Sequence, residues 1–395
     1  MARPTLVLDA DELNACVACG LCLPHCPTFR VTGDEGLSPR GRIEAMRAVA
    51  WRDAPIDDEF VEFMSTCVQC RGCEPACPSG VPYGSLIEAT NTQLAARREI
   101  TPRWVRWGLG ALRHHTLLLF GSSLIAVAQR LRLVPRRFVS GRLPLRRGPS
   151  VRPTATAATA DAWLFTGCVM DAWMRATHRS TARVLDAIDV SYALPGPGGA
   201  CCGALHAHAG LHATAATMAA AVMESMPGDA PILVNSAGCG AALKEYGILL
   251  GTAEAAAFSA RVLDVHEYVA AHVDRLPELS ALDESVVVHD PCHLRHVQRA
   301  HEPVRDLIGR IAAVVELDDS GLCCGAGGAY SVTEPELASD IRDRKLAAFD
   351  RAIDATGASR AVSANPGCLM HLAGPLAERG VRIQHPIDLV AAALP

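Results

Sequence analysis

Eight cysteines in the first hundred residues fall into two groups with the same internal spacing. The groups are Cys16, Cys19, Cys22 and Cys26, then Cys67, Cys70, Cys73 and Cys77, each closed by a proline. This C-x2-C-x2-C-x3-C-P run is the bacterial pattern for ligating [4Fe–4S] clusters. Three thiolates two residues apart wrap a loop around one face of a cubane, and the proline then directs the chain away.

The two runs predict two clusters with exchanged ligands. In two-cluster ferredoxins the fourth cysteine of each run ligates the other cluster. We therefore expect Cys16, Cys19, Cys22 and Cys77 to hold one [4Fe–4S] cluster and Cys67, Cys70, Cys73 and Cys26 to hold the second. Zinc is the alternative, because C-x2-C pairs also bind zinc. A doubled run of this form is an unusual way to supply four tetrahedral ligands, so the pattern favours an electron relay without catalytic residues.

Eight further cysteines form an internal repeat in the second half of the chain. The first copy has Cys168, a Cys201-Cys202-Gly203 triplet and Cys239; the second has Cys292, Cys323-Cys324-Gly325 and Cys368. Matching cysteines are 124, 122, 122 and 129 residues apart, which indicates a duplicated unit. A soft, all-thiolate site suits iron–sulfur or zinc. The spacing leaves open whether each copy holds a cluster, zinc or no metal.

The elements around these cysteines predict a multi-domain fold. Leu37 to Trp51, Phe60 to Thr66 and Ser85 to Arg98 are expected to be helical, which makes residues 1–100 a small, mostly α-helical two-cluster domain. In the repeats, short β-branched runs alternate with Ala-rich stretches, as in βα units around a parallel sheet. We therefore expect two pseudo-repeated α/β domains, 161–275 and 285–395, with cysteines just after the strands, where open α/β sheets place ligands.

Residues 101–160 separate the two regions and differ from both in charge. The stretch from 100 to 160 carries eleven arginines and no acidic residue. Residues 116–129 are apolar, but a bilayer span needs about 20 residues. We expect a basic amphipathic helix, contacting membrane or quinone through residues 103–152, packed on a partner subunit, or joining domains. The following stretch, 136–160, is expected to be an exposed linker.

Charged and titratable side chains near the cysteines allow two interpretations. Arg40 and Arg42 either offset the negative charge of the clusters or form a solvated helix start. Six histidines lie near cysteines, and such residues more often hydrogen-bond to a metal site than ligate it. They are His25, His206, His208, His289, His293 and His296.

The repeat resembles the cysteine-rich domain of heterodisulfide reductase-like proteins. A fuller version in that family ends in C-x-x-C and holds a non-cubane cluster. Here Ser236 and Asn365 replace the first cysteine of each terminal pair, which argues against a five-thiolate cluster. The order of motifs over residues 10–395, with the strings Ser38 to Ile43 and Cys323 to Tyr330, resembles the iron–sulfur subunits of bacterial glycolate oxidases (glycolate dehydrogenases).

That resemblance implies the non-catalytic electron-transfer subunit of an oxidoreductase complex. FAD-binding partner subunits oxidise a 2-hydroxyacid, most simply glycolate, and this chain passes electrons toward a membrane quinone. The sequence has no G-x-G-x-x-G after an expected strand, no P-loop and no nucleophile elbow, so no flavin is expected on this chain. The expected cofactors are two [4Fe–4S] clusters, with one or two further clusters in the repeats, and no nucleic acid partner.

Two other interpretations are weighed against this one. The same motifs occur in lactate-utilisation and anaerobic glycerol-3-phosphate dehydrogenase subunits, and in heterodisulfide reductases the repeats themselves are redox centres. Cellular location follows from the cysteines, since a start without a basic-then-apolar leader favours a reducing compartment. We expect a cytoplasmic protein, peripheral on the inner face of the cell membrane.

Overall fold

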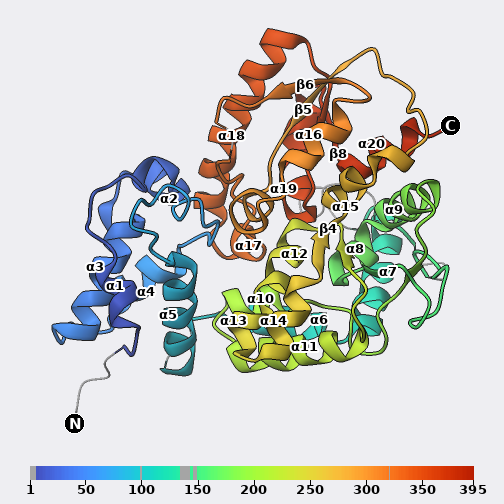
Figure 1. Cartoon of the computed structure of the whole chain (residues 1–395). Helices are drawn as coiled ribbons and strands as arrows, with labels where there is room; N and C mark the ends of the chain where they lie inside the picture. The colour runs from blue at the N-terminus through green and yellow to red at the C-terminus, as the bar shows by residue number, and fades with distance from the viewer. Residues whose placement is uncertain (1–5, 98–99, 134–142, 146–148, 320) are drawn as a thin grey trace.

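The computed structural model describes residues 6–97, 100–133, 143–145, 149–319 and 321–395. A helical N-terminal region lies on one side of two α/β units, and a helical pair lies on the other side (Figure 1). The predicted fold class is therefore confirmed: mostly α-helical at the N-terminus, with parallel α/β sheets in the C-terminal region.

The N-terminal region consists of short helices joined by the cysteine loops. One apolar cluster, which includes Leu13, Met46, Phe60, Met64 and Ile87, holds the helices together. The three expected helices are present as α3, α4 and α5. The elements are α1 (Ala10–Asn14), η1 (Leu23–His25), α2 (Pro27–Thr32), η2 (Glu35–Leu37), α3 (Pro39–Trp51), α4 (Asp58–Ser65) and α5 (Tyr83–Arg97).

Two helices follow, α6 (Arg103–Leu112) and α7 (His115–Arg130), with a bend of 108° between them. They are attached to the first α/β unit rather than to the N-terminal region. The His115 imidazole lies 2.9 Å from the Asp171 carboxylate, and the Trp173 indole donates to the Ser122 hydroxyl at 2.9 Å. We call α6 and α7 together the hairpin.

The first α/β unit has a four-stranded parallel sheet in the order β2-β1-β3-β4. Apolar clusters cover both faces of the sheet. Its elements are β1 (Ala162–Phe165), α8 (Cys168–Trp173), α9 (Arg175–Ala187), β2 (Tyr192–Ala193), α10 (Ala204–His208), α11 (His212–Ser225), β3 (Ile232–Val234), α12 (Ala237–Lys244), α13 (Tyr246–Leu250), α14 (Ala253–Ala260), β4 (Val262–Asp264), α15 (Val265–Ala271) and η3 (Val273–Arg275).

The second unit repeats the first, with a parallel sheet in the order β6-β5-β7-β8. Each strand occupies the place of its counterpart four strands earlier, so the sequence repeat is a repeat of topology. Its elements are β5 (Ser285–Val288), the π-helix η4 (His293–Gln298), α16 (Glu302–Ile308), β6 (Ala313–Glu316), α17 (Tyr330–Thr333), α18 (Pro335–Thr356), β7 (Arg360–Val362), α19 (Pro366–Glu378), β8 (Arg382–Gln384) and α20 (Pro386–Ala393).

The expectation of an exposed linker after the hairpin is wrong in part. Residues 134–142 and 146–148 lie outside the described residues. Leu143, Ser150 and Val151 are buried, and Val151 joins the core of the first unit. The chain is held there because the Thr154 amide donates to the Tyr192 carbonyl at 3.0 Å, along the edge strand β2.

Candidate iron–sulfur sites

The structure gathers the eight N-terminal cysteines into the two sets that the ferredoxin pattern predicts. One cavity of about 20 Å³ is lined by Cys16, Cys19, Cys22 and Cys77. A second cavity of about 20 Å³ is lined by Cys26, Cys67, Cys70 and Cys73. We call these cavities the outer and inner ferredoxin sites. Four cysteine thiols around one enclosed space are the donor set that a [4Fe–4S] cluster needs.

The two cysteine loops adopt the same backbone conformation. Ala18 and Gly20 have positive φ in the first loop, and Gln69 and Arg71 have positive φ at the matching positions of the second. Non-glycine residues seldom adopt such values, and they persist where the surroundings require them. The left-handed residues curl each loop, so that its first three cysteines face one cavity.

Arg42 supplies positive charge beside the inner ferredoxin site. Its side chain is only 1% exposed and donates to Thr28 and Thr66 hydroxyls at 3.3 Å and to the Phe63 carbonyl. Its guanidinium also lies 4.0 Å from the Cys26 sulfur. Among its contacts in the described residues there is no carboxylate, although a buried cation is costly without an anion. A negatively charged thiolate cluster would provide that anion.

The helix start that carries Arg42 is fixed by local chemistry. Ser38 caps α3, with its hydroxyl accepting from the Gly41 amide at 3.0 Å, and Pro39 occupies the first helical position. A Cβ at Gly41 would lie 1.8 Å from the Glu35 carbonyl oxygen, so only glycine fits. Arg40 lines the outer site and donates to the Ala18 carbonyl. Of the two interpretations, the solvated helix start is wrong for Arg42.

The cysteines of each repeat also come together, at the carboxyl ends of the strands. In the first repeat Cys168 contacts Cys201, Cys201 contacts Cys202, and Cys202 contacts Cys239. In the second, the same pairs form among Cys292, Cys323, Cys324 and Cys368. We call these groups repeat site 1 and repeat site 2. Each brings four thiols to the point between the first and third strands where the strand order reverses, the usual ligand position of such sheets.

The residues that replace a fifth cysteine still contact the cysteine site. The Asn365 amide donates to the Cys368 sulfur at 3.5 Å, and Ser236 hydrogen-bonds to Cys239. Asn365 also accepts from the Gly238 amide at 3.2 Å, across the boundary between the repeats. These side chains would orient thiolate ligands rather than act as ligands themselves.

The donor sets suit metal-bound thiolates. Burial raises the pKa of Cys73 well above its ordinary value, and buried neighbouring thiols raise it further. Such a thiol becomes a thiolate when a metal cation offsets the lost solvation. Within the described part of the chain, no three His, Cys, Asp or Glu side chains are grouped closely enough to hold a single metal ion.

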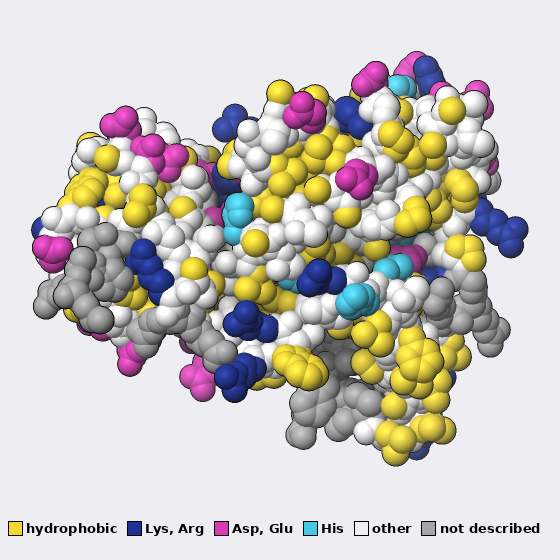
Figure 2. All heavy atoms as spheres, turned by 90° about the horizontal axis from the view of Figure 1, so that it is seen from below, with side chains coloured by type: hydrophobic (Ala, Val, Ile, Leu, Met, Phe, Trp, Pro, Cys, Tyr) yellow, Lys and Arg dark blue, Asp and Glu magenta, His cyan; other side chains and the backbone are white. Residues whose placement is uncertain are grey.

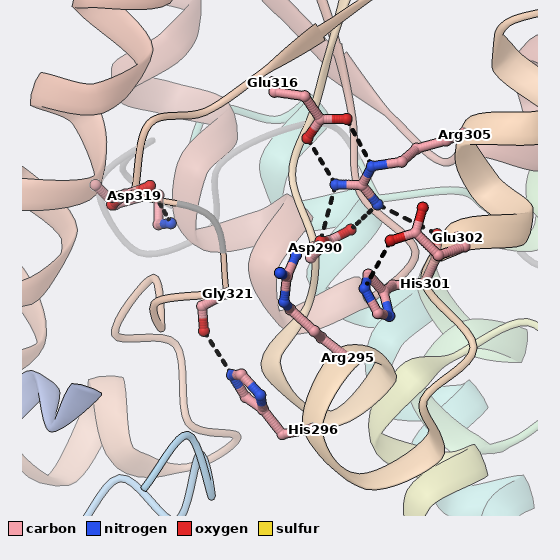
Figure 3. Close-up of polar contacts among 10 residues, drawn as sticks. Asp290, Arg295, His296, His301, Glu302, Arg305, Glu316, Asp319 and Gly321 are labelled. Carbon is pink, nitrogen blue, oxygen red and sulfur yellow. Dashed lines mark hydrogen bonds and ion pairs between the residues drawn. The ribbon is translucent and has the colours of Figure 1, made fainter. Parts of the chain in front are cut away.

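A polar network positions repeat site 2 (Figure 3). Asp290, at the end of β5, accepts from Arg295 at 2.7 Å and from Arg305 at 3.0 Å, and its side chain is 2% exposed. Burial opposes ionisation of Asp290, but the Arg305 and Arg295 hydrogen bonds outweigh it and lower the pKa. The His296 ring donates to the Gly321 carbonyl at 2.6 Å. The network thereby joins the loop of the first cysteine to the loop of the cysteine pair.

Repeat site 2 directly contacts the inner ferredoxin site. The thiols of Cys70 and Cys323 hydrogen-bond to each other, 253 positions apart in the sequence. Both belong to one buried cluster with Val68, Tyr330 and Ile341. Repeat site 1 instead packs on the hairpin, as Leu112 and Leu118 lie against Cys168, Cys201 and Met218.

Of the six histidines singled out from the sequence, His293 contacts a repeat cysteine by a hydrogen bond, with its Nδ1 3.6 Å from the Cys292 sulfur. His289 bonds to Ser363. Sequence reasoning missed Tyr83, whose hydroxyl lies 3.6 Å from the Cys67 sulfur, and His371, which lies close enough to Cys324 to interact with it electrostatically. Their positions follow from helix packing, and no local motif marks them.

Comparison with known proteins gives the same division. Residues 12–81 match the "4Fe-4S dicluster domain" family, and residues 162–244 and 286–373 match the "Cysteine-rich domain" family. A probable glycolate oxidase iron–sulfur subunit of Bacillus subtilis is 33% identical, over 98% of this chain and 95% of its own. The glycolate oxidase iron–sulfur subunit of Escherichia coli is 31% identical, over 100% of this chain and 97% of its own. The chain belongs to the glycolate oxidase iron–sulfur subunit family.

A more distant relative is similar along the whole chain. A dihydromethanophenazine:CoB–CoM heterodisulfide reductase polypeptide of Methanosarcina acetivorans is 28% identical, over 100% of this chain and 99% of its own. This chain is thus similar along its whole length to one component of a heterodisulfide reductase as well. The resemblance predicted from the motifs is confirmed, and the chain is an iron–sulfur subunit of an oxidoreductase complex.

Proposed function

We propose that this chain is the electron-transfer subunit of a flavin-dependent 2-hydroxyacid dehydrogenase, with glycolate as the favoured substrate. FAD-binding partner subunits remove two electrons from the hydroxyacid, and this chain carries them one at a time toward a membrane quinone. The observation that carries the proposal is the set of four cysteine sites, in which the inner ferredoxin site contacts repeat site 2 through Cys70 and Cys323.

The ligand sets follow the cysteine groups. Cys16, Cys19, Cys22 and Cys77 would hold one [4Fe–4S] cluster, and Cys67, Cys70, Cys73 and Cys26 the other. Each repeat site would hold a further cluster on its four cysteines. When bound, these groups supply one-electron carriers. The protein supplies the thiolates, the Arg42 charge and the buried contact between Cys70 and Cys323 that keeps two sites close.

The hairpin is proposed as the membrane contact, at the inner face of the cell membrane. It carries seven of the fifteen large apolar side chains that are exposed among the described residues, including Trp107 at 83% and Phe120 at 61%. Figure 2 shows a dense group of hydrophobic side chains on the side of the molecule that carries the hairpin. Among the described residues no single helix is long and apolar enough to cross a membrane. The helices α6 and α7, whose axes are bent by 108° relative to each other, reach that length and apolar composition only when they are taken together.

Charge supports an anionic lipid surface. Positions 100–160 carry eleven arginines and no acidic residue. Helices with arginine beside tryptophan and phenylalanine bind at the interface of anionic bilayers. Repeat site 1 lies directly beneath the hairpin, so electrons that reach this site are next to the membrane.

The first test is iron and acid-labile sulfide per chain on anaerobically purified protein, with low-temperature EPR. Replacing the eight N-terminal cysteines by serine should remove about eight irons and leave about eight in the repeats. Iron that disappears completely with this replacement would contradict clusters in the repeats. Zinc in place of iron would overturn the proposed function altogether.

A second candidate is a disulfide-reducing subunit, which the similarity to the heterodisulfide reductase polypeptide favours. Ser236 and Asn365 weigh against it, because each stands where a fifth thiolate would be needed. Co-purification discriminates between the two. Flavoprotein subunits that oxidise glycolate in the isolated complex support the dehydrogenase, and reduction of a disulfide by the isolated complex supports the alternative.

A further inference from the structure

A cavity of about 440 Å³ lies between the N-terminal region and the first repeat. Its walls come from α5 on one side and from α10, α12 and α13 on the other. Cys202 of repeat site 1 and His293, which follows a cysteine of repeat site 2, both line it. Cavities of this size hold small molecules. The cavity therefore places a small ligand beside two cysteine sites at once.

Most of the wall is apolar and built from small residues. Ala204, Ala207, Ala242, Ile87 and Leu249 contribute to it. Small side chains on facing helices leave a broad, smooth surface on which a flat ring can lie. Such a wall favours a ligand that is largely apolar.

The charged residues of the wall already have partners. Arg71 forms ion pairs with Glu74, at 2.8 Å, and with Glu245. His208 lies 3.4 Å from the Glu88 carboxylate. An anionic hydroxyacid or an anionic disulfide would have to compete with these carboxylates for the one arginine in the wall. The cavity therefore suits a neutral ligand with hydrogen-bonding groups.

We propose that this cavity binds the ring of a quinone. The site deepens the proposed function, on which it rests, by naming where the electron acceptor binds. A quinone is neutral, flat and largely apolar, and its two carbonyl oxygens accept hydrogen bonds. The rings of His208 and His293, whose centroids lie 5.8 Å apart, both line the wall, and His208 beside Glu88 donates through its Nε2 when the ring is protonated.

Reduction at this site balances with groups already named. The quinone takes up two electrons and two protons, and its two carbonyl groups become hydroxyls. Clusters held by the cysteine sites would supply the electrons one at a time and be reoxidised, and Cys202 of repeat site 1 is the cysteine that lines the cavity. The protons pass through the Glu88–His208 pair and Glu245, which water replenishes.

A second, smaller cavity gives the ligand a path from the hairpin. It has a volume of about 180 Å³ and is lined by Thr101, Pro102 and Val105, where α6 begins. Both cavities have Gln69 and His208 in their walls. A quinone taken from the lipid surface beneath α6 can thus keep its tail in the smaller cavity while its ring reaches the larger one.

The experiment fills the cavity without removing a polar group. Ala207→Phe places a ring in the wall, and Ala220→Phe, at an exposed position of α11 that lines neither cavity, is the matched control. Binding of ubiquinone-1 to the full chain is measured by anaerobic equilibrium dialysis. Ala207→Phe should weaken binding by about tenfold or more, since added bulk in a pocket has effects of this size, and Ala220→Phe should leave it unchanged.

A second readout follows the clusters. Dithionite-reduced protein is mixed with ubiquinone-1 or with ferricyanide, which needs no binding site, and reoxidation is followed by absorbance. Ala207→Phe should slow the quinone reaction alone. Equal binding and equal rates in the variant and the wild type would overturn the site. Absence of clusters would overturn the proposed function instead, because dialysis tests the cavity without them.

Discussion

The two repeats have the same strand order and the same four cysteines, but they face different neighbours. Repeat site 2 contacts the inner ferredoxin site through Cys323, whereas repeat site 1 packs beneath the hairpin. The difference lies outside the sheets, in the residues that each copy presents to the rest of the chain. The difference teaches that two copies of one site can have different roles in electron transfer, with one copy placed to receive electrons and the other placed to pass them on.

The largest effect should come from cysteine variants at matched positions, Cys323→Ser and Cys201→Ser. Each should remove about four irons, those of its own repeat site. Only Cys323→Ser should also change the EPR signal of the inner ferredoxin site, because Cys70 touches Cys323 and not Cys201. EPR of the reduced proteins measures this. An equal change in the EPR signal of the inner ferredoxin site in both variants would contradict the view that only repeat site 2 contacts that site.

A second pair of variants compares the carboxylates near the first cysteine of each repeat. Asp290→Ala should lower the free energy of unfolding by about 2–3 kcal/mol, because it removes charge-assisted hydrogen bonds to two half-buried arginines, of which Arg305 keeps Glu316 as a partner. Asp171→Ala should lower it by about 1 kcal/mol, since its hydrogen-bonded partner His115 is a partly exposed imidazole and Arg175 lies farther away, at 3.8 Å. Anaerobic urea unfolding gives both values. A larger decrease in the free energy of unfolding for Asp171→Ala than for Asp290→Ala would contradict this expectation.

The hairpin tests whether repeat site 1 faces the membrane. Trp107→Ser with Phe120→Ser should weaken binding to phosphatidylglycerol vesicles by about a hundredfold, as two large apolar side chains no longer leave water. Val332→Ser, an exposed apolar position of the second repeat, is the control and should bind normally. Co-sedimentation measures binding. Wild-type binding that is equal on phosphatidylcholine vesicles would contradict the role of the arginines.

The last comparison concerns pH and the boundary between the repeats. Burial lowers the pKa of His178 to about 4, below its ordinary value of 6.5. The neutral ring therefore stabilises the fold fully above pH 6.5, and this contribution is lost as pH falls toward 4. At pH 5 the loss should be about 2 kcal/mol. Urea unfolding at pH 7 and pH 5 tests it, with His178→Asn expected to show a smaller difference.

The parts of the structure that were predictable are those that local spacing determines. The cysteine runs specify loops whose thiols face one cavity, and the strands that end shortly before Cys168 and Cys292 follow from apolar runs. The repeat of sheet order followed from matching cysteines at nearly constant separation. In each case the residues that form the feature lie within a few positions of one another, or the pattern that indicates it occurs twice in the sequence.

The remainder depends on packing between distant segments. No pattern marks the contact between Cys70 and Cys323, because it arises where the N-terminal region docks on the second repeat. The burial of Arg42 depends on Thr28 and Thr66, which are ordinary threonines in the sequence. The basic composition after the hairpin suggested exposure, but Val151 is apolar and packs in the core of the first unit, and Thr154 bonds to the neighbouring edge strand.

The hydrogen bonds at the boundary between the repeats differ between the two copies. The spacing of 129 residues places Ala237 opposite Pro366 and Asn235 opposite Ala364. The Ala237 amide donates to the Ala364 carbonyl at 3.0 Å. The reciprocal bond cannot form, because Pro366 has no N–H, and the His385 ring donates to the Asn235 carbonyl instead, also at 3.0 Å.

Two units that meet through equivalent segments have the arrangement of a two-fold homodimer whose subunits have been fused. In a homodimer every substitution occurs twice, so both faces must accept the same residue. Fusion removes that constraint, and a proline on one side can be answered by a histidine on the other. The shared strand order is kept in both sheets, and the contacts at their edges differ, with one repeat against the inner ferredoxin site and the other against the hairpin.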